Sequence, residues 1–328
     1  MLRGEDKELL LIAPKYFGYE NEIKNRLESY GFKVSLIYEN LDKVSHYYKF
    51  IKSRFPQKMG EITDRFFIDT IRKCSKETKV VVVIRGEYLS PKDIALMKEY
   101  FAPECKYVLY QWDGVKNNPN SLVIADKFDR VFSFDISDSN AYGWRYRPLF
   151  YIDKYINRQT KSIDLLYVCS LHSDRVRILN EIKNISKANG LTYKAVLYEK
   201  RYIYLKRKYI DRKKDYIFAD DSDMTFRPLS IQETYELYGK ARAVVDYTHP
   251  GQTGLTMRTI ECIGNACKLI TNNTLIKSSN FFNENNILIY QDALNIPIEF
   301  IKSDYIVNAE IIKKYSIDSF LEDLLGDI

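Results

Sequence analysis

The chain has 328 residues, of which 45% are hydrophobic, so it can build two packed cores and is not expected to be disordered. Its net charge of +6, from 50 basic and 44 acidic residues, is too small to predict a nucleic-acid partner by itself. No apolar run reaches the roughly 18 residues of a membrane-spanning helix, and the charged first residues do not read as a signal peptide. The five cysteines and three histidines show no metal-ligand spacing, which favours reduced thiols in a cytoplasmic protein.

The first half of the chain alternates short apolar runs with helical patterns. This rhythm predicts an α/β domain with a parallel sheet and helices on both faces. Strands are expected at residues 8–13, 32–38, 79–84, 106–111 and 130–134, and helices at about 19–31, in much of 41–74, and from 91 onward.

Polar side chains follow two of these strands. Glu87 follows the strand at 79–84 and Asp113 follows the strand at 106–111, so both are expected at the same rim of the sheet. A carboxylate there can accept a proton from a substrate hydroxyl, and Asp113 is favoured over Glu87 because Trp112 lies beside it as a stacking surface. The alternative for both residues is an ordinary capping or surface role.

The start of the first helix supplies two further candidates. Glu20 is a third candidate proton acceptor, and Tyr19 beside it can join Trp112 in binding a sugar acceptor. The alternative for Glu20, and the favoured one, is a helix N-terminal charge that complements the helix dipole.

The second half restarts the same pattern after a polar stretch at 152–162. Three parts are predicted: a Rossmann-like domain at 1–155, a second one at 156–308, and a final helix within 309–328 that packs back across the boundary. Strands are expected at 164–169, 193–197, 243–247 and 268–271, and helices at 173–190, 231–240, 255–263 and 309–325.

The first strand and helix of this half are joined by a polar turn. Ser170, Ser173 and Arg175 can hold a phosphate there, because a helix N-terminus offers free backbone amides and a partial positive charge. The alternative is a capped helix with a surface arginine.

The segment 200–216 interleaves basic and aromatic residues. We expect it to touch anionic lipid headgroups, which would make the protein peripheral on the inner face of the membrane. Two alternatives stay open, a nucleic-acid surface and a solvated amphipathic helix.

The stretch at 246–273 is the most informative. A strand is followed by a turn of small and polar residues, and then by a helix that carries Arg258 in its first turn and Glu261 one turn later. Such a helix start favours a diphosphate, and a carboxylate on the same face can accept hydrogen bonds from a ribose. The alternative is an ordinary strand, turn and helix with a surface Arg–Glu pair. The predicted donor-binding residues of this stretch are His249, Thr253, Gly254, Arg258 and Glu261.

The sequence HPGQTGLTMRTIE at 249–261, followed by KLIT at 268–271, resembles the donor-binding segment of bacterial lipopolysaccharide and capsular polysaccharide glycosyltransferases of the GT-B type. A looser similarity links it to CgeB-like proteins. The likeness extends over most of the chain, through IRGEYLSP at 84–91, YQWDG at 110–114, FDRVFSFDISD at 128–138, RPLFY at 147–151 and DLLYVCSLHSDR at 164–175.

The resemblance implies two Rossmann-like domains that face each other across a cleft. It implies transfer of a sugar from a nucleotide-sugar donor, held by the second domain, to a glycan or lipid-linked acceptor, held by the first. No metal or other cofactor is expected, and nucleic acid is not expected as a partner. Many retaining enzymes of this type carry a second glutamate eight positions after the first, where this chain has Leu269. Two rival functions stay open: a sugar-nucleotide epimerase of the same fold, and a non-catalytic nucleotide- or nucleic-acid-binding protein.

Overall fold

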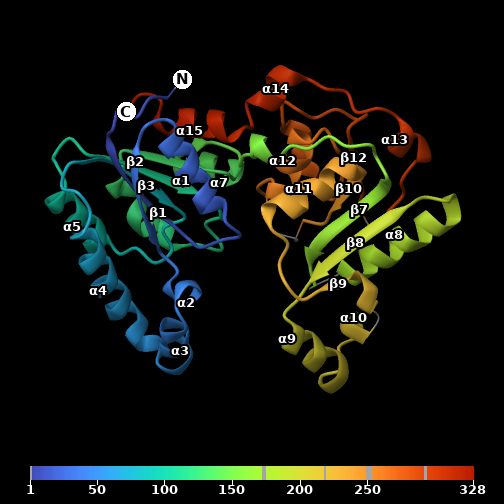
Figure 1. Ribbon diagram of the computed structural model, residues 1–328, viewed down its shortest axis with the longest axis horizontal. Helices are drawn as coiled ribbons and strands as arrows, with labels where there is room; N and C mark the ends of the chain where they lie inside the picture. The colour runs from blue at the N-terminus through green and yellow to red at the C-terminus, as the bar shows by residue number, and fades with distance from the viewer. Residues whose placement is uncertain (1, 172–174, 218, 249–252, 292–293) are drawn as a thin grey trace. The chain divides into compact units, whose positions relative to one another are not determined.

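The computed structural model describes residues 2–171, 175–217, 219–248, 253–291 and 294–328. The chain divides into two compact units (Figure 1). The first consists of residues 1–149 and 317–328, and the second of residues 150–316.

The first unit contains a six-stranded sheet in the order β2-β1-β3-β4-β5-β6, and all of its neighbouring strands are parallel. The chain direction across the sheet reverses between β1 and β3, which makes this the switch point where ligands bind in open α/β sheets. The strands are β1 (Glu8–Ala13), β2 (Lys33–Tyr38), β3 (Thr78–Ile84), β4 (Lys106–Gln111), β5 (Arg130–Ser133) and β6 (Arg145–Tyr146).

Helices cover both faces of this sheet, so its central strands are buried on both sides. Val81, Val83 and Leu109 pack with the helices α4 and α5, whereas the ring of Tyr110 packs against Phe320 of α15. The helices are α1 (Tyr19–Ser29), α2 (Leu41–Val44), α3 (His46–Arg54), α4 (Met59–Ile71), α5 (Pro91–Tyr100), α6 (Asn120–Ile124), α7 (Ile136–Tyr142) and α15 (Ile317–Leu325).

The second unit contains another six-stranded parallel sheet, in the order β12-β11-β10-β7-β8-β9. Counted from β7 as the first strand, this is the 3-2-1-4-5-6 order of dinucleotide-binding domains, and its switch point lies between β7 and β10. The strands are β7 (Ile163–Ser170), β8 (Tyr193–Tyr198), β9 (Met224–Thr225), β10 (Ala241–Asp246), β11 (Lys268–Thr271) and β12 (Ile287–Ile289).

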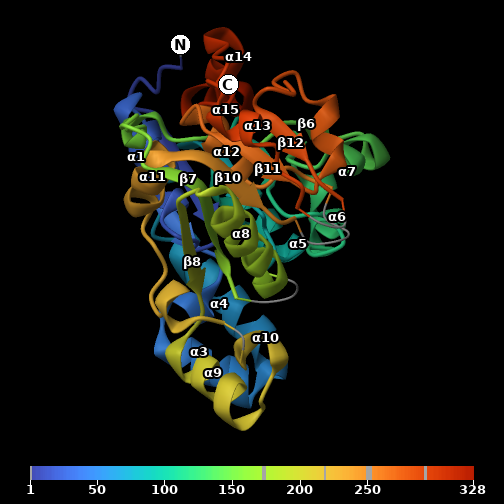
Figure 2. The same ribbon diagram turned by 90° about the vertical axis from the view of Figure 1, so that its right-hand side faces the viewer.

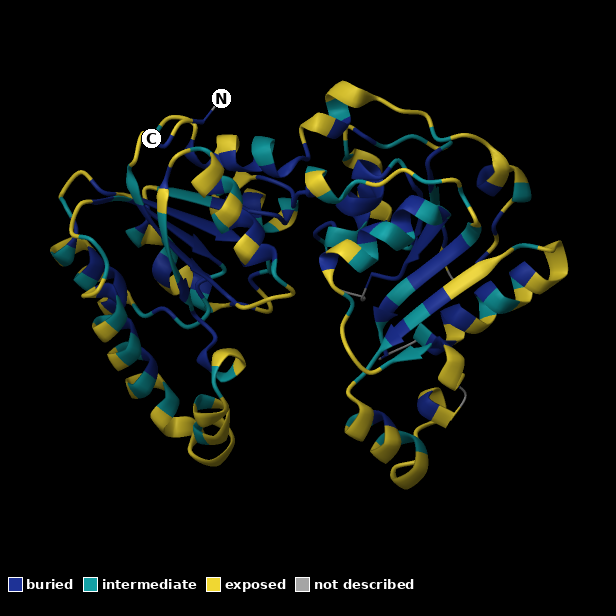
Figure 3. Ribbon diagram, in the orientation of Figure 1, coloured by how far each residue is buried: buried dark blue, intermediate teal, exposed yellow. Residues whose placement is uncertain are grey.

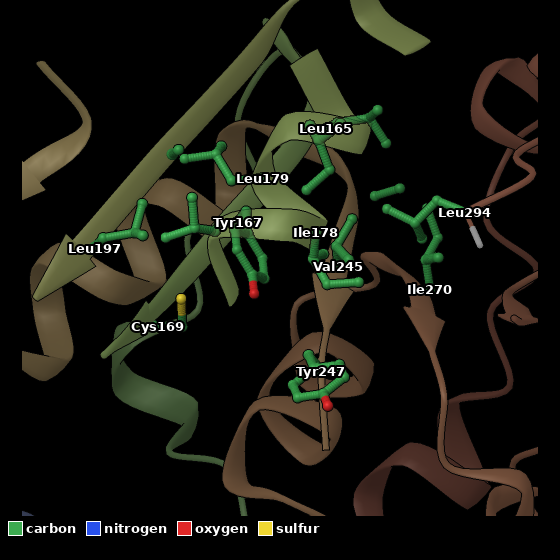
Figure 4. Packing of buried hydrophobic residues seen from close by; sticks show 14 of the residues in the cluster. Leu165, Tyr167, Cys169, Ile178, Leu179, Leu197, Val245, Tyr247, Ile270 and Leu294 are labelled. Carbon is green, nitrogen blue, oxygen red and sulfur yellow. The ribbon is translucent and has the colours of Figure 1, made fainter. Parts of the chain in front are cut away.

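One face of the second sheet packs on α8 and α13, and the other packs on α11 and α12. α8 lies along β7 and β8 (Figure 2), and Leu179 and Ile182 of this helix join Leu165, Val245 and their neighbours in one buried cluster (Figure 4). The helices are α8 (Arg175–Asn189), α9 (Arg201–Leu205), α10 (Lys214–Ile217), α11 (Ile231–Lys240), α12 (Met257–Gly264), α13 (Ile298–Lys302) and α14 (Ala309–Lys313).

The α/β class and the two parallel sheets are confirmed. The prediction of a single final helix at 309–325 is wrong, because the backbone at residues 315 and 316 leaves the helical conformation and pairs with Tyr151. Tyr151 N–H donates to the carbonyl of Tyr315 (2.8 Å), and Tyr151 forms a parallel bridge with Ser316. The helix is thereby divided into α14, which stays with the second unit, and α15, which belongs to the first. In the described part of the chain, no helix has the length and apolar character that crossing a bilayer requires.

Candidate functional site

In the second unit, the carboxyl ends of β7 and β10 mark the switch point, because these two strands are neighbours in the sheet. Asp246 is the last residue of β10 and has no exposed surface. Its carboxylate accepts hydrogen bonds from the hydroxyls of Thr256 (2.7 Å) and Thr259 (3.3 Å) and forms an ion pair with Arg258. Thr256 also caps α12 by accepting from the Thr259 amide. The first turn of α12 is therefore tied to the end of β10.

Arg258 is held in its charged form by this arrangement. Burial works against the charge, but Asp246 outweighs that effect and raises the pKa of Arg258 above its ordinary value. Sequence reasoning identified Arg258 and missed Asp246, although Asp246 has the same strand-end position as the carboxylates that were noticed.

A second guanidinium, that of Arg175, lies at the start of α8. It donates to the carbonyl of Ser170 (2.9 Å), the last residue of β7. The charges of Arg175 and Arg258 both act on the thiol of Cys169, where burial raises the pKa and the two arginines lower it. Arg175 and Arg258 therefore both lie near Cys169, next to Ser170 at the end of β7. That these residues bind an anion stays a prediction.

Two buried polar atoms here have no hydrogen-bond partner among the described residues. They are Nε of Arg175 and the hydroxyl of Tyr167, on which the charges of both arginines act. Figure 4 shows the hydroxyl end of Tyr167 pointing away from the leucines of the core, alongside Cys169. Unsatisfied buried donors are costly, and an oxygen-rich ligand can satisfy them.

The other predicted donor residues have different environments. Glu261 is buried in α12 and accepts a hydrogen bond from the hydroxyl of Tyr238 (3.4 Å), so its carboxylate lies in the interior of the unit. Gly254 is buried and Thr253 half-buried in the loop before α12. Ser173 and His249 lie outside the described residues.

In the first unit, a strained turn follows β3 at the switch point. Arg85 and Gly86 both have left-handed backbone conformations, with φ of 74° and 67°. The turn is fixed from several sides, since the Arg85 N–H donates to the carbonyl of Tyr110 and its carbonyl accepts from the amides of Gln111 (2.6 Å) and Asn118 (2.8 Å). A conformation that costs of the order of 1 kcal/mol or more persists only with such support, and it is typical of functional sites.

The Arg85 side chain joins both predicted catalytic carboxylates. It lies 2.8 Å from an oxygen of Glu87 and 3.4 Å from an oxygen of Asp113. Asp113 also accepts from the Gly114 N–H (3.1 Å) and the Asn117 amide (3.0 Å). The two carboxylates are therefore brought together, as predicted, by an arginine that the sequence analysis did not single out.

A third carboxylate, Glu39, follows β2 and is completely buried. Neither of its oxygens accepts a hydrogen bond of standard geometry from a described residue. Burial raises the pKa of Glu39 to about 8, and the nearby Arg85 charge and the backbone amides of Tyr88 and Glu87 only partly oppose this. Glu39 was missed, although the rule that selects Glu87 and Asp113 selects it as well.

The predicted acceptor-binding aromatics are also brought together. The ring of Trp112 lies edge-on to those of Tyr16 (5.9 Å) and Tyr19 (6.4 Å), and Tyr16 lies edge-on to Phe17 (4.6 Å). Tyr16 and Phe17 are half exposed, and Phe17 has a left-handed φ of 56°. Tyr16 and Phe17, with Trp112, form an aromatic surface that the buried ring of Tyr19 supports, and such a surface suits the apolar face of a sugar.

Glu20 has a different environment. It is buried, and its carboxylate accepts from the Tyr16 N–H (3.1 Å) and from the Asn21 amide (3.0 Å). These contacts fit the alternative in which Glu20 holds the turn before α1. Among the described residues, no group of three or more His, Cys, Asp and Glu side chains is arranged to hold a metal ion.

The sequence matches no protein-family model and no curated protein. Solved structures do resemble the chain. A glycosyltransferase from Rickettsia africae ESF-5 has a TM-score of 0.58 at 12% identity, over 98% of this chain and 100% of that chain. Anabaena HepE in complex with UDP and glucose has a TM-score of 0.55 at 9% identity, with coverage of 98% and 100%. A Listeria monocytogenes protein designated a UDP-N-acetylglucosamine 2-epimerase has a TM-score of 0.51 at 11% identity, with coverage of 98% and 88%. The chain therefore has a glycosyltransferase-like GT-B fold with two Rossmann-like sheets.

Proposed function

We propose that this protein is a glycosyltransferase that moves a sugar from a nucleotide-sugar donor to a glycan or lipid-linked glycan acceptor in bacterial surface polysaccharide synthesis. The observation that carries the proposal is the pair of arginines at the switch point of the second unit. Arg175 and Arg258 come from the first turns of two helices, and the charges of both act on Cys169 and Tyr167 at the end of β7. Such a site suits the diphosphate of a nucleotide sugar.

The chemistry expected of this site is stabilisation of the leaving diphosphate. Two guanidinium groups and the amino end of α12 offset negative charge as it develops on the departing nucleotide, which needs no metal ion. Asp246 fixes Arg258 in place, so little reorganisation is needed when the donor binds.

The first unit is assigned the acceptor. The aromatic surface of Tyr16, Phe17, Tyr19 and Trp112 holds a sugar ring, and Asp113 at its edge accepts the proton of the attacking hydroxyl. Arg85 forms ion pairs with both Asp113 and Glu87 and so fixes the positions of the two carboxylates.

A panel of UDP-, GDP-, CMP- and TDP-sugars tests the proposal through donor hydrolysis and nucleotide affinity. We expect one nucleotide to bind and its sugar to be released slowly without an acceptor. Calorimetry that finds no binding of any nucleotide or nucleotide sugar would contradict the proposal and favour a non-catalytic protein.

A second candidate function is sugar-nucleotide epimerisation, which the likeness to the Listeria protein favours. Product analysis separates the two reactions. An epimerase converts the donor sugar without an added acceptor, whereas a transferase yields a new glycosidic linkage only when an acceptor is present.

We also propose that segment 200–214 contacts anionic lipid. Its exposed aliphatic and aromatic side chains include Tyr202, Tyr209 and Ile210. Some of its cations already have partners, since Lys208 pairs with Asp221 (2.7 Å) and Arg207 with Glu199 (3.2 Å). If reversing the charges of Lys206, Arg207, Lys213 and Lys214 leaves vesicle binding intact, this contact is rejected.

A further inference from the structure

A helix of the first unit presents aromatic rings to solvent. α3 lies at the end of α4 that is farther from the sheet (Figure 1), and none of its nine residues is buried. Tyr47 and Phe50 are 63% and 61% exposed, and the neighbouring Val44 and Phe55 are exposed as well. Figure 3 shows this helix almost wholly in the colour of exposed residues.

The two sides of α3 differ. Tyr48 faces the unit, where its ring lies 6.2 Å from that of Phe66, and Lys52 bonds the hydroxyl of Tyr88 (2.9 Å). Tyr47 and Phe50 are three positions apart and therefore share the opposite side of the helix. A helix this short gains most of its stability from packing an apolar face, yet α3 turns two of its aromatic rings away from the unit.

The charge around these rings is of one sign. Residues 43–58 contain five basic residues, Lys43, Lys49, Lys52, Arg54 and Lys58, and no acidic residue. Lys52 pairs with Asp42 (3.2 Å), and the other four have no ion pair among the described residues. This contrasts with segment 200–214, where acidic side chains neutralise part of the charge.

We propose that α3 and its flanking turns, residues 43–58, dock on an anionic lipid bilayer. Exposed tyrosine and phenylalanine rings suit the boundary between headgroups and acyl chains, and unpaired cations around them complement the negative surface. The inference concerns a different surface from segment 200–214 and does not depend on the proposed activity.

The test is cosedimentation of the full chain with phosphatidylcholine vesicles, with and without phosphatidylglycerol. Each near-surface cation contributes roughly fivefold to partitioning. We therefore expect Lys49→Gln with Arg54→Gln to weaken binding to the anionic vesicles by about 25-fold, and Tyr47→Ser with Phe50→Ser to abolish most of it. A third variant, Tyr209→Ser with Ile210→Ser, removes two exposed side chains from segment 200–214 and distinguishes the two proposed lipid surfaces.

Every outcome decides the proposal. Loss of binding in both α3 variants supports it, whether or not the Tyr209 and Ile210 variant also binds more weakly. It is overturned if wild type does not bind, or if either α3 variant binds the anionic vesicles as wild type does, because the proposal requires both the cations and the rings. A change of mass in solution on Tyr47→Ser with Phe50→Ser, with vesicle binding unchanged, would instead identify a second copy of the chain as the occupant. Because the substituted side chains are exposed, circular dichroism should show native folding in all variants.

Discussion

Asp246 is a charged side chain without exposed surface, and Arg258 is the cation that neutralises it. Arg258→Ala should therefore have two effects. It should lower nucleotide affinity by about tenfold to a hundredfold, through a lost charge-assisted contact. It should also destabilise the fold by up to about 3–5 kcal/mol, the cost of leaving a buried charge unpaired, reduced by the two threonine hydroxyls that remain.

Asp246→Asn combined with Arg258→Ala separates these effects. The double variant removes the unpaired charge, so we expect part of the stability to return while nucleotide affinity stays low. Urea unfolding and calorimetry measure the two quantities. Wild-type affinity in either variant would remove Arg258 from the donor site.

Glu39 should make the stability of the protein depend on pH. Its pKa of about 8 in the folded chain lies well above its ordinary value, so the folded chain holds this proton more tightly than the unfolded chain. Wild type should therefore lose stability as pH rises from about 4.3 to 8. The loss is about 1.4 kcal/mol for each tenfold difference in proton affinity between the folded and the unfolded chain. The Glu39→Gln variant has no titratable group at this position. Its stability relative to wild type should therefore increase between about pH 4.3 and 8 and stay constant above about pH 8. Urea unfolding of both proteins at several pH values measures this difference, and a constant difference would contradict the assignment.

The choice between Asp113 and Glu87 is a question of rates. Asp113→Asn should keep donor binding and lose transfer by about a hundredfold or more, the usual scale for a general base. Glu87→Gln is the matched control, because it removes the other carboxylate paired with Arg85. A large loss confined to Glu87→Gln would assign the role to Glu87, and near wild-type transfer in Asp113→Asn would reject Asp113.

One physical reason explains why some residues of these sites could be predicted from the sequence and others could not. Parallel strands end at a common rim, so the first polar residue after a strand is a site candidate, and this identified Glu87 and Asp113. The same rule selects Glu39 and Asp246. Their burial, and the contact of Arg85 with two carboxylates, depend on packing between distant segments, which strand patterns do not specify.

At the scale of elements, the longer strands were predicted closely because they are continuous apolar runs. β6, β9 and β12 were missed, since strands of two or three residues are too short to show an alternating pattern. The break between α14 and α15 was missed for a different reason. The amphipathic pattern continues through residue 316, and only the tertiary pairing with Tyr151 interrupts the helix.

Two helical glycines provide a test of element packing. A Cβ at Gly239 in α11 would lie 1.9 Å from the carbonyl oxygen of Asn157, whereas one at Gly60 in α4 would meet nothing within 4 Å. Gly239→Ala should therefore destabilise the second unit by about 1–3 kcal/mol through overpacking. Gly60→Ala should stabilise the first unit by about 0.5–1 kcal/mol, because alanine favours the helix. Equal effects in urea unfolding would show that residue 157 does not pack closely on α11.

At the scale of the molecule, the alternation of strands and helices predicts two parallel sheets. It does not specify the strand orders, β2-β1-β3 in one unit and β10-β7-β8 in the other, which set the switch points. The expectation that the last helix packs back across the domain boundary rests instead on the amphipathic pattern of residues 309–325. Phe320 of α15 is fully buried against Tyr110, and Asp323 pairs with Arg147 at 2.7 Å.

The dependence of each unit on its own core can be measured separately, because both tryptophans, Trp112 and Trp144, lie in the first unit. Tryptophan fluorescence therefore follows the first unit, whereas circular dichroism follows both. Phe320→Ala should lower the free energy of unfolding of the first unit by about 3–5 kcal/mol, the usual cost of removing a buried ring. The matched variant Phe300→Ala removes a buried ring from α13 of the second unit.

We expect Phe320→Ala to shift the fluorescence transition in urea to lower concentration. Phe300→Ala should leave that transition in place and shift only the remaining part of the dichroism signal. If Phe300→Ala moves the fluorescence transition as far as Phe320→Ala does, the two units unfold as one cooperative block. In that case the first unit, completed by α15, would not unfold independently of the second.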